Sequence, residues 1–122
     1  MTEDMGEHLR ILVVEDEPLL SMLLEEHIDE LGHIVAASVS TVDQAMNALD
    51  AALPDCALLD YSLSGDSTSA PVAHRLREAG VPFTYLSGHA DLSHDDRAPP
   101  GPTLQKPYSL DQLQKAIAGM HP

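Results

Sequence analysis

Four short apolar runs in this chain each end on residues that could carry out metal-binding or phosphoryl chemistry. Glu15-Asp16 follows ILVV, Asp60 follows ALL, Ser87-Gly88 follows FTYL, and Lys106 follows TLQ. If each run is a buried parallel strand, all four ends lie at one edge of one sheet, because parallel strands place their carboxyl ends together. We therefore expect three carboxylates, a hydroxyl and an ammonium group to converge around Asp60.

The carboxylates of Glu15, Asp16 and Asp60 predict a site for a hard divalent cation. Mg²⁺ prefers carboxylate, carbonyl and water oxygens, and Mn²⁺ accepts similar ligands. Taken alone, the pair Glu15-Asp16 is better explained as a solvated turn before a helix, since acidic strand-to-helix turns are common. The third carboxylate, that of Asp60, changes the interpretation to a metal site.

Asp60 could attack phosphorus and hold the phosphoryl group as an aspartyl phosphate. Phosphoryl transfer spreads negative charge over three equatorial oxygens, so it requires in-line positioning and cationic or hydrogen-bonding groups. A metal held by Asp16 and Asp60, the Lys106 ammonium, the Ser87 hydroxyl and nearby backbone N–H groups would supply them. Alone, Ser87 and Lys106 indicate no more than a turn and a solvated side chain. Their combination with the carboxylates predicts phosphoryl chemistry.

Strands and helices alternate in the elements that must position these residues. Apolar runs predict strands at 10–14, 33–39, 56–59, 81–86 and 103–105. Helices are expected from Pro18 to Gly32, after a Thr41 cap, from a Ser69 cap to Gly80, and from Ser109 onward. In the first helix, Leu19, Leu20, Leu23, Leu24, Ile28 and Leu31 recur at helical spacing and predict an inner face. The stretch after Gly88 predicts at most a short or mobile helix. This alternation predicts an α/β fold with a parallel sheet and helices on both faces.

Composition limits the classes of protein that this chain can represent. Its 122 residues fit a single domain, which we expect at 9–122 after a flexible tail at 1–8. A net charge of −14 disfavours nucleic acid and anionic membranes and favours a cation or a basic partner. The acidic start lacks a secretory signal, no apolar run could span a membrane, and Cys56 has no disulfide partner. These features predict a soluble, cytoplasmic protein.

With these residues in view, the chain resembles the receiver domains of two-component response regulators. The matching motifs are VVEDEP, PDCALLDYSLSG, PFTYLSG and LQKPYS, which span nearly the whole chain in order. In that family the matching aspartate accepts a phosphoryl group from a phosphohistidine of a sensor histidine kinase or a histidine phosphotransfer protein. The resemblance implies a flavodoxin-like α/β fold, with a five-stranded parallel sheet of order 2-1-3-4-5 flanked by five helices.

The resemblance also implies a role for each residue at the predicted site. Asp60 is the phosphoacceptor and, with Asp16, a ligand of Mg²⁺ or Mn²⁺. Glu15 acts on the metal through water, and the carbonyl of Ser62 is a further ligand. Contacts to the phosphoryl group come from Ser87, Lys106 and the N–H groups of Tyr61 and Gly88.

The finer pattern is similar to a subfamily of single-domain receivers called FAT GUY proteins. The similarity lies in GDSTSAPVA, the PF that opens the fourth strand, SGH and PTLQKPYS. Ser87 stands in place of the usual Thr and keeps the hydroxyl, and His89 replaces Tyr or Gly. Thr103 occupies the place of an aromatic residue that moves inward on phosphorylation in most receivers. We therefore expect a signal to travel through reordering of residues 89–102.

The leading hypothesis is a stand-alone phosphorelay protein, a monomer or weak dimer, whose phosphorylation alters a surface read by another protein. That surface is expected at the strand 103–105 and the helices on either side of it. One alternative is a receiver-like binding module that never accepts phosphate. Another is an aspartate-nucleophile phosphatase, a class that carries a second acid where this chain has Ser62. We therefore expect a phosphoacceptor and not a multiple-turnover enzyme.

Overall fold

Strands and helices alternate along the chain in the computed structural model, which describes residues 8–63, 68–88 and 98–120. The elements are β1 (Arg10–Val14), α1 (Pro18–Glu30), β2 (Ile34–Val39), α2 (Val42–Ala51), β3 (Cys56–Asp60), α3 (Ala70–Glu78), β4 (Phe83–Ser87), β5 (Thr103–Gln105) and α4 (Leu110–Ala118). The predicted α/β alternation is confirmed. The additional helix expected after Gly88 falls on residues 89–97, outside the described residues.

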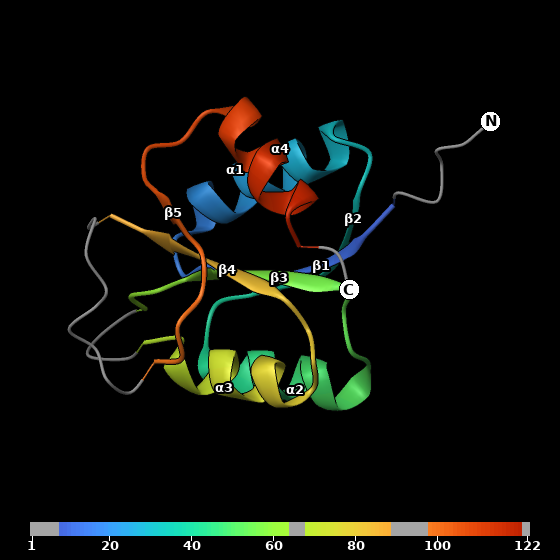
Figure 1. Cartoon of the computed structure of the whole chain (residues 1–122), viewed down its shortest axis with the longest axis vertical. Coiled ribbons are helices and arrows are strands. Elements are labelled where there is room, and N and C mark those ends of the chain that lie inside the picture. The colour runs from blue at the N-terminus through green and yellow to red at the C-terminus, as the bar shows by residue number, and fades with distance from the viewer. Residues whose placement is uncertain (1–7, 64–67, 89–97, 121–122) are drawn as a thin grey trace.

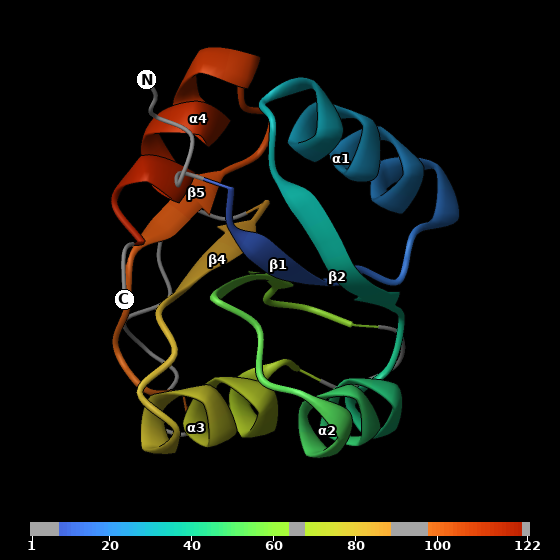
Figure 2. The ribbon, with the colours of Figure 1, turned by 90° about the vertical axis from the view of Figure 1, so that its right-hand side faces the viewer.

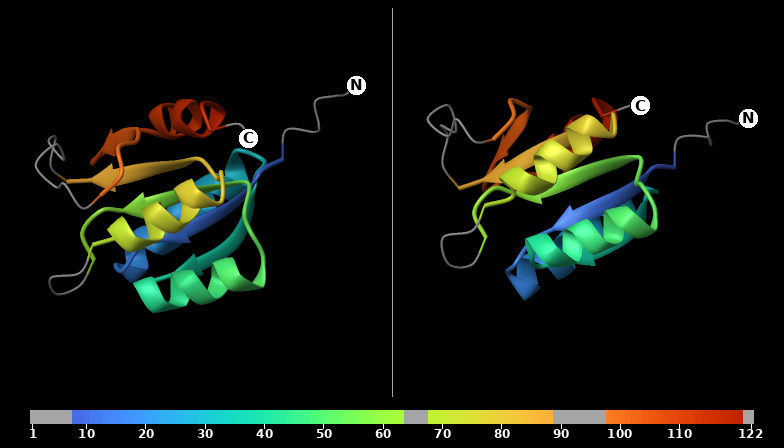
Figure 3. Two further views of the ribbon diagram at one scale, coloured as in Figure 1. Left: turned by 60° about the horizontal axis from the view of Figure 1, so that its bottom comes forward. Right: turned by 90° about the horizontal axis from the view of Figure 1, so that it is seen from below.

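The five strands form one parallel sheet of order β2-β1-β3-β4-β5, as predicted. Helices α1 and α4 cover one face of this sheet, and α2 and α3 cover the other (Figures 1 and 2). The strands all run in the same direction, so their carboxyl ends share one edge (Figure 3). This edge is where the predicted site residues lie.

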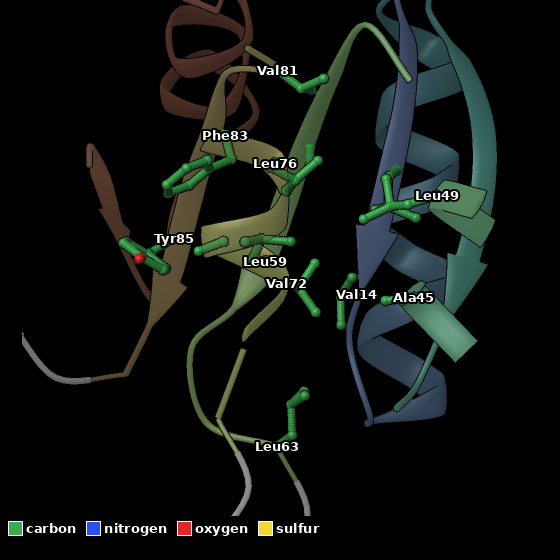
Figure 4. Packing of buried hydrophobic residues seen from close by; sticks show 13 residues of the cluster. Val14, Ala45, Leu49, Leu59, Leu63, Val72, Leu76, Val81, Phe83 and Tyr85 are labelled. Atoms are coloured by element: carbon green, nitrogen blue, oxygen red, sulfur yellow. The ribbon is translucent and has the colours of Figure 1, made fainter. Parts of the chain in front are cut away.

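The central strands are buried on both faces, which explains why they are continuous apolar runs. Alternate residues of β1 enter different clusters: Leu12 and Val14 pack toward α2 and α3, while Ile11 and Val13 pack toward α1 and α4. Figure 4 shows the first cluster, in which Leu59 and Tyr85 project from β3 and β4. All five residues of β3 are buried, so Asp60 ends a strand that has no exposed position.

Polar caps and glycines define most helix ends as predicted. Thr41 Oγ1 accepts a hydrogen bond from the Gln44 N–H, which caps α2, and Ser109 forms a capping box with Gln112 at the start of α4. Gly32 and Gly80 adopt positive φ values of 87° and 76° after α1 and α3. Glycine adopts this conformation most readily, so each helix ends two residues before its glycine, at Glu30 and Glu78.

The prediction that the Ser69 side chain caps α3 is wrong. Ser69 precedes the helix, but its φ of −85° and ψ of 9° differ from the extended conformation of a capping residue, and its side chain makes no cap bond. The hydroxyl of Thr68 accepts the Ala70 N–H at 3.3 Å instead. Ser69 is fully buried, and its Oγ has no hydrogen-bond partner in the structure.

Residues 1–7 of the predicted tail lie outside the described residues, whereas His8 contacts the domain. The Nδ1 atom of His8 hydrogen-bonds the carbonyl of Gly32, and the Leu9 N–H donates to His33 Nδ1 at 3.1 Å. In the described ranges, no helix is both long enough and apolar enough to cross a membrane.

Candidate functional site

The carboxyl edge of the sheet brings the predicted reactive residues together. Glu15 and Asp16 follow β1, Asp60 is the last residue of β3, Ser87 is the last of β4, and Lys106 follows β5. The strand register explains their convergence, because Asp60 pairs with Leu86 and Ser87 pairs with Gln105 across neighbouring strands. The parallel order of β1, β3, β4 and β5 therefore places the predicted carboxylates, hydroxyl and ammonium at one edge.

Three carboxylates form a cluster of the kind that binds a divalent cation. Glu15, Asp16 and Asp60 each offer an oxygen, and these atoms all lie within 4.8 Å of one another. Glu15 and Asp60 are only 3% and 7% exposed. Such hard oxygen ligands fit Mg²⁺ or Mn²⁺ and not a metal that prefers thiolate or imidazole. No other cluster of at least three His, Cys, Asp or Glu side chains with this spacing occurs in the described part of the chain.

Lys106 supplies the positive charge of the site. Its Nζ lies 3.2 Å from Glu15 Oε1 and 3.3 Å from Asp60 Oδ1. Its backbone N–H donates to the Ser87 carbonyl at 2.7 Å, which ties the residue after β5 to the end of β4. One ammonium group against three carboxyl groups leaves the site with an excess of acidic groups, which favours binding of a divalent cation.

Burial raises the pKa of Asp60 from its ordinary value of 3.8 to about 7. A hydrogen bond with Glu15 and the charge of Glu15 add to this rise, and the nearby Lys106 opposes it. Burial alone would lower the pKa of Lys106, but the charges of Asp60 and Glu15 outweigh burial, so the pKa is raised. Lys106 is therefore cationic at neutral pH, while Asp60 lies near the midpoint of its titration, and a divalent cation beside it would favour the ionised form.

The remaining predicted residues at this edge of the sheet differ in accessibility. Ser87 is buried, whereas Gly88 and Ser62 are exposed. The N–H group of Tyr61 donates to the Leu86 carbonyl at 2.9 Å, so in this structure it extends the β3–β4 hydrogen bonding. A phosphoryl oxygen would have to share or replace that bond. The contacts of these groups to metal and phosphoryl stay predictions.

Tyr108 adds a half-buried aromatic residue beside the site, and the LQKPYS motif that contains it gave it no predicted role. Burial, followed by the negative charges of Glu15 and Asp60, raises its pKa to about 12, so it stays neutral beside them. It follows Pro107, and the Lys106–Pro107 peptide bond is cis. The ring also packs against the core cluster beneath α1 and α4.

Part of the predicted inner face of α1 is in fact exposed. Leu24 and Ile28 are buried, but Leu19, Leu20 and Leu23 are exposed, together with Met22. A helix that packs on one face of a sheet can bury only one stripe of its own surface. The apolar residues of α1 cover more than one such stripe. The exposed residues lie in the first two turns of α1, which begin directly after Glu15, Asp16 and Glu17.

Comparisons with known proteins identify the family. Residues 11–118 match the model of the response regulator receiver domain. The chain is 31% identical over 111 residues to the phyllosphere-induced regulator PhyR of Methylorubrum extorquens, covering 88% of this chain and 42% of PhyR. It is 32% identical over 109 residues to the transcriptional regulatory protein TcrA of Mycobacterium tuberculosis, covering 86% of this chain and 43% of TcrA. The chain thus spans less than half the length of these curated relatives.

Solved structures show the same relationship in three dimensions. The receiver domain of Erythrobacter litoralis PhyR superposes with a TM-score of 0.82 at 28% identity, covering 92% of this chain and 88% of that one. SdrG of Sphingomonas melonis Fr1 superposes with a TM-score of 0.78 at 39% identity, covering 91% of this chain and 94% of SdrG. Since the family model matches most of the sequence and the sheet order agrees, this chain belongs to the response regulator receiver domain family.

Proposed function

We propose that this protein is the receiver of a two-component phosphorelay and accepts a phosphoryl group on Asp60 from a phosphohistidine donor. The observation that carries the proposal is the position of Asp60. This buried carboxylate lies within 4.8 Å of two others and 3.3 Å from the Lys106 ammonium. A buried acid needs a cation beside it to stay ionised, and a phosphoryl group needs cations to neutralise its oxygens.

The proposed reaction is a transfer between two nucleophiles. A carboxylate oxygen of Asp60 attacks phosphorus, a P–O bond forms, and the P–N bond breaks with its electron pair remaining on the donor imidazole. Lys106 neutralises the charge that remains on the phosphoryl oxygens, and Ser87 would donate its hydroxyl to one of them. Mg²⁺ held by Asp16 and Asp60, when bound, would supply further electrostatic stabilisation.

The donor protein is proposed to dock on the exposed start of α1. Leu19 is 76% exposed, Met22 and Leu23 are also exposed, and all three lie beside the acidic residues that precede the helix. Further along the same helix, Glu26 and Glu30 are exposed. An apolar patch bordered by acids fits a partner with an apolar face and basic flanks, such as a histidine kinase or a histidine phosphotransfer protein. It does not fit nucleic acid or an anionic membrane.

The output is proposed to be a changed protein-binding surface, without turnover of small phosphoesters. This chain covers 94% of the SdrG chain in its solved structure, which fits an output made through the surface of the receiver itself. One alternative is a receiver-like module that is never phosphorylated. None of the described contacts in the site favours it. The phosphatase alternative would require a second acid at Ser62, which is exposed and bridges to Thr68.

The test is phosphoryl uptake from acetyl phosphate and from a histidine kinase of the source organism, followed on phosphate-affinity gels with Mg²⁺ present. The wild type should be phosphorylated with both donors, and Asp60→Asn with neither. Asp50→Asn is a matched control, because Asp50 makes an exposed ion pair with Arg75 away from the site. Uptake by Asp60→Asn equal to that of the wild type would refute the proposal. Amide NMR during Mg²⁺ titration separates the alternatives, since a module without a metal site would show no shifts around Asp16 and Asp60.

The docking surface has a separate test. Leu19→Ser with Met22→Ser should slow transfer from the kinase by roughly tenfold or more, because exposed apolar anchors of an interface contribute over a kcal/mol each. Uptake from acetyl phosphate, which needs no docking, should stay within about twofold. Equal losses with both donors would place the defect in the site and contradict a docking role.

A further inference from the structure

A proline-rich segment, residues 98–102, is held against β4 by two hydrogen bonds from Tyr85 and by packing on Phe83. The hydroxyl of Tyr85 donates to the Pro99 carbonyl at 2.6 Å, and the Tyr85 N–H donates to the Pro102 carbonyl at 2.9 Å. Gly101 packs on the Phe83 ring so closely that a Cβ atom there would lie 2.9 Å from a ring carbon. We call residues 98–102 the strap. Its closest contacts with β4 thus involve Tyr85 and Phe83.

Tyr85 also belongs to a row of three aromatic rings. It makes edge-to-face contacts with Phe83, at a centroid distance of 5.2 Å, and with Tyr61, at 5.7 Å. Phe83 and Tyr85 project from the same face of β4 (Figure 4). Edge-to-face pairs prefer a defined geometry, so a displacement of Tyr61 alters the position that Tyr85 prefers.

Tyr61 is covalently next to Asp60 and is hydrogen-bonded to β4. Its N–H donates to the Leu86 carbonyl at 2.9 Å, one residue from Tyr85. A phosphoryl group on Asp60 would present oxygens to this N–H, and a charged acceptor forms the stronger hydrogen bond. The bond from Tyr61 to Leu86 would then lengthen or break, and the Tyr61 ring would move relative to Tyr85.

The neighbouring position on β5 cannot take over this function. Thr103 pairs with Tyr85 in the sheet register, but it is short and exposed. Tyr85 is 2% exposed, and burial raises the pKa of its hydroxyl to about 12, so it remains a donor at any physiological pH. A buried tyrosine hydroxyl needs a partner, and the described structure gives it the carbonyl of Pro99.

We propose that Tyr85 is a positioning residue that couples Asp60 to the strap, and that its hydrogen bond to Pro99 is released when Asp60 carries a phosphoryl group. This inference rests on the proposed function of Asp60. The strap leads directly into β5, so its release changes the surface next to Thr103. The residue that carries the signal is thus on β4 and acts through a main-chain carbonyl.

Tyr85→Phe tests the hydrogen bond without removing the ring. The phenylalanine ring keeps its contacts with Tyr61 and Phe83, while the bond to Pro99 is lost. The readout is amide hydrogen exchange at Ala98, Gly101 and Thr103, since the prolines of the strap have no amide hydrogen. Thr84→Val is the matched control, because it removes a buried hydroxyl of β4 that donates to Met120 Sδ at 3.2 Å on the other face of the sheet.

Beryllium fluoride with Mg²⁺ serves as the stable phosphoryl mimic. In the wild type, its addition should speed exchange at these amides by about fivefold, the change expected for one lost hydrogen bond. In Tyr85→Phe, exchange should already be fast without the mimic and change by less than about twofold on its addition. Thr84→Val should respond as the wild type does. A wild-type response that persists in full in Tyr85→Phe overturns the proposal.

Two further measurements separate this inference from the proposed function. If the mimic causes no NMR shifts near Asp60 in the wild type, the proposed function of Asp60 is refuted. If those shifts occur but the strap amides do not respond, only the proposed role of Tyr85 is refuted. In fluorotyrosine-labelled wild type, which has three tyrosines, the ¹⁹F signal of Tyr85 should move on addition of the mimic. An unmoved Tyr85 signal overturns the inference without relying on any substitution.

Discussion

Replacing the phosphoacceptor should stabilise the metal-free protein, although most core substitutions are destabilising. In Asp60→Asn, the side chain keeps its size, loses its charge, and gains an amide that can donate to Glu15. The pKa of Asp60 is raised from 3.8 to about 7, mainly by burial, so the folded state disfavours the ionised form. Three pKa units correspond to about 4 kcal/mol at full ionisation. This shift already includes the attraction of Lys106. We expect about half of the full value, since relaxation and water penetration reduce the cost of a buried charge.

The pH dependence follows from the direction of the shift. Below about pH 4 both the folded and unfolded wild type hold the Asp60 proton, so the difference from Asp60→Asn is small. Between about pH 4 and pH 7 the unfolded state loses the proton first, and the wild type loses stability as the pH rises. Above pH 7, the variant should be more stable by about 2 kcal/mol.

Urea denaturation in EDTA at pH 5 and pH 8 measures this difference. Asp50→Asn, which removes one exposed ion pair, should change stability by less than about 1 kcal/mol at either pH. Adding Mg²⁺ should stabilise the wild type and Asp50→Asn, but not Asp60→Asn, by about 2.7 kcal/mol at a hundred times its dissociation constant. A variant that is less stable than the wild type at pH 8, or a difference that does not change with pH, would refute the reasoning.

Three further substitutions give distinct outcomes. Lys106→Met should lower the initial rate of phosphorylation by roughly a hundredfold, because it removes the cation beside Asp60. In a single-turnover assay, a loss below about threefold would contradict this role. Ser87→Thr should keep the phosphorylation rate within about threefold of the wild-type rate, whereas Ser87→Ala should lower it about tenfold or more. Equal rates for the two variants would show that the hydroxyl is not used. Gly101→Ala should destabilise the protein by about 1–3 kcal/mol in thermal unfolding, since its Cβ would lie 2.9 Å from the Phe83 ring; an unchanged melting temperature would show that the ring can move aside.

The sheet and the convergence of the site could be predicted from sequence because both depend on local patterns. A strand buried on both faces must be a continuous apolar run, so the residue that ends the run lies at the edge of the sheet. Glu15, Asp60, Ser87 and Lys106 each stand at such an end. Their proximity then requires only that the strands be parallel and adjacent, which the alternation with helices indicates.

The details that the sequence could not provide depend on tertiary geometry. The apolar residues of α1 have helical spacing on more than one stripe, and only contact with the sheet decides that Leu24 is buried and Leu19 is not. Serine is a common helix-capping residue, but the backbone of Ser69 before α3 is not extended as a capping residue requires. The contact of Tyr85 with Pro99 joins residues 14 positions apart through the β4–β5 register, and no local pattern specifies it.

The charge of the site predicts the order of metal binding and phosphoryl transfer. Glu15, Asp16 and Asp60 together outweigh Lys106, and the whole chain carries a net charge of −14. An incoming phosphoryl group is itself anionic, so it would meet repulsion at an edge that is already negative. A divalent cation held by these carboxylates would offset this negative charge and would favour the ionised, nucleophilic form of Asp60. Metal binding should therefore precede transfer, because the raised pKa of Asp60 leaves about half of this carboxyl protonated, and so not nucleophilic, in the metal-free protein at neutral pH.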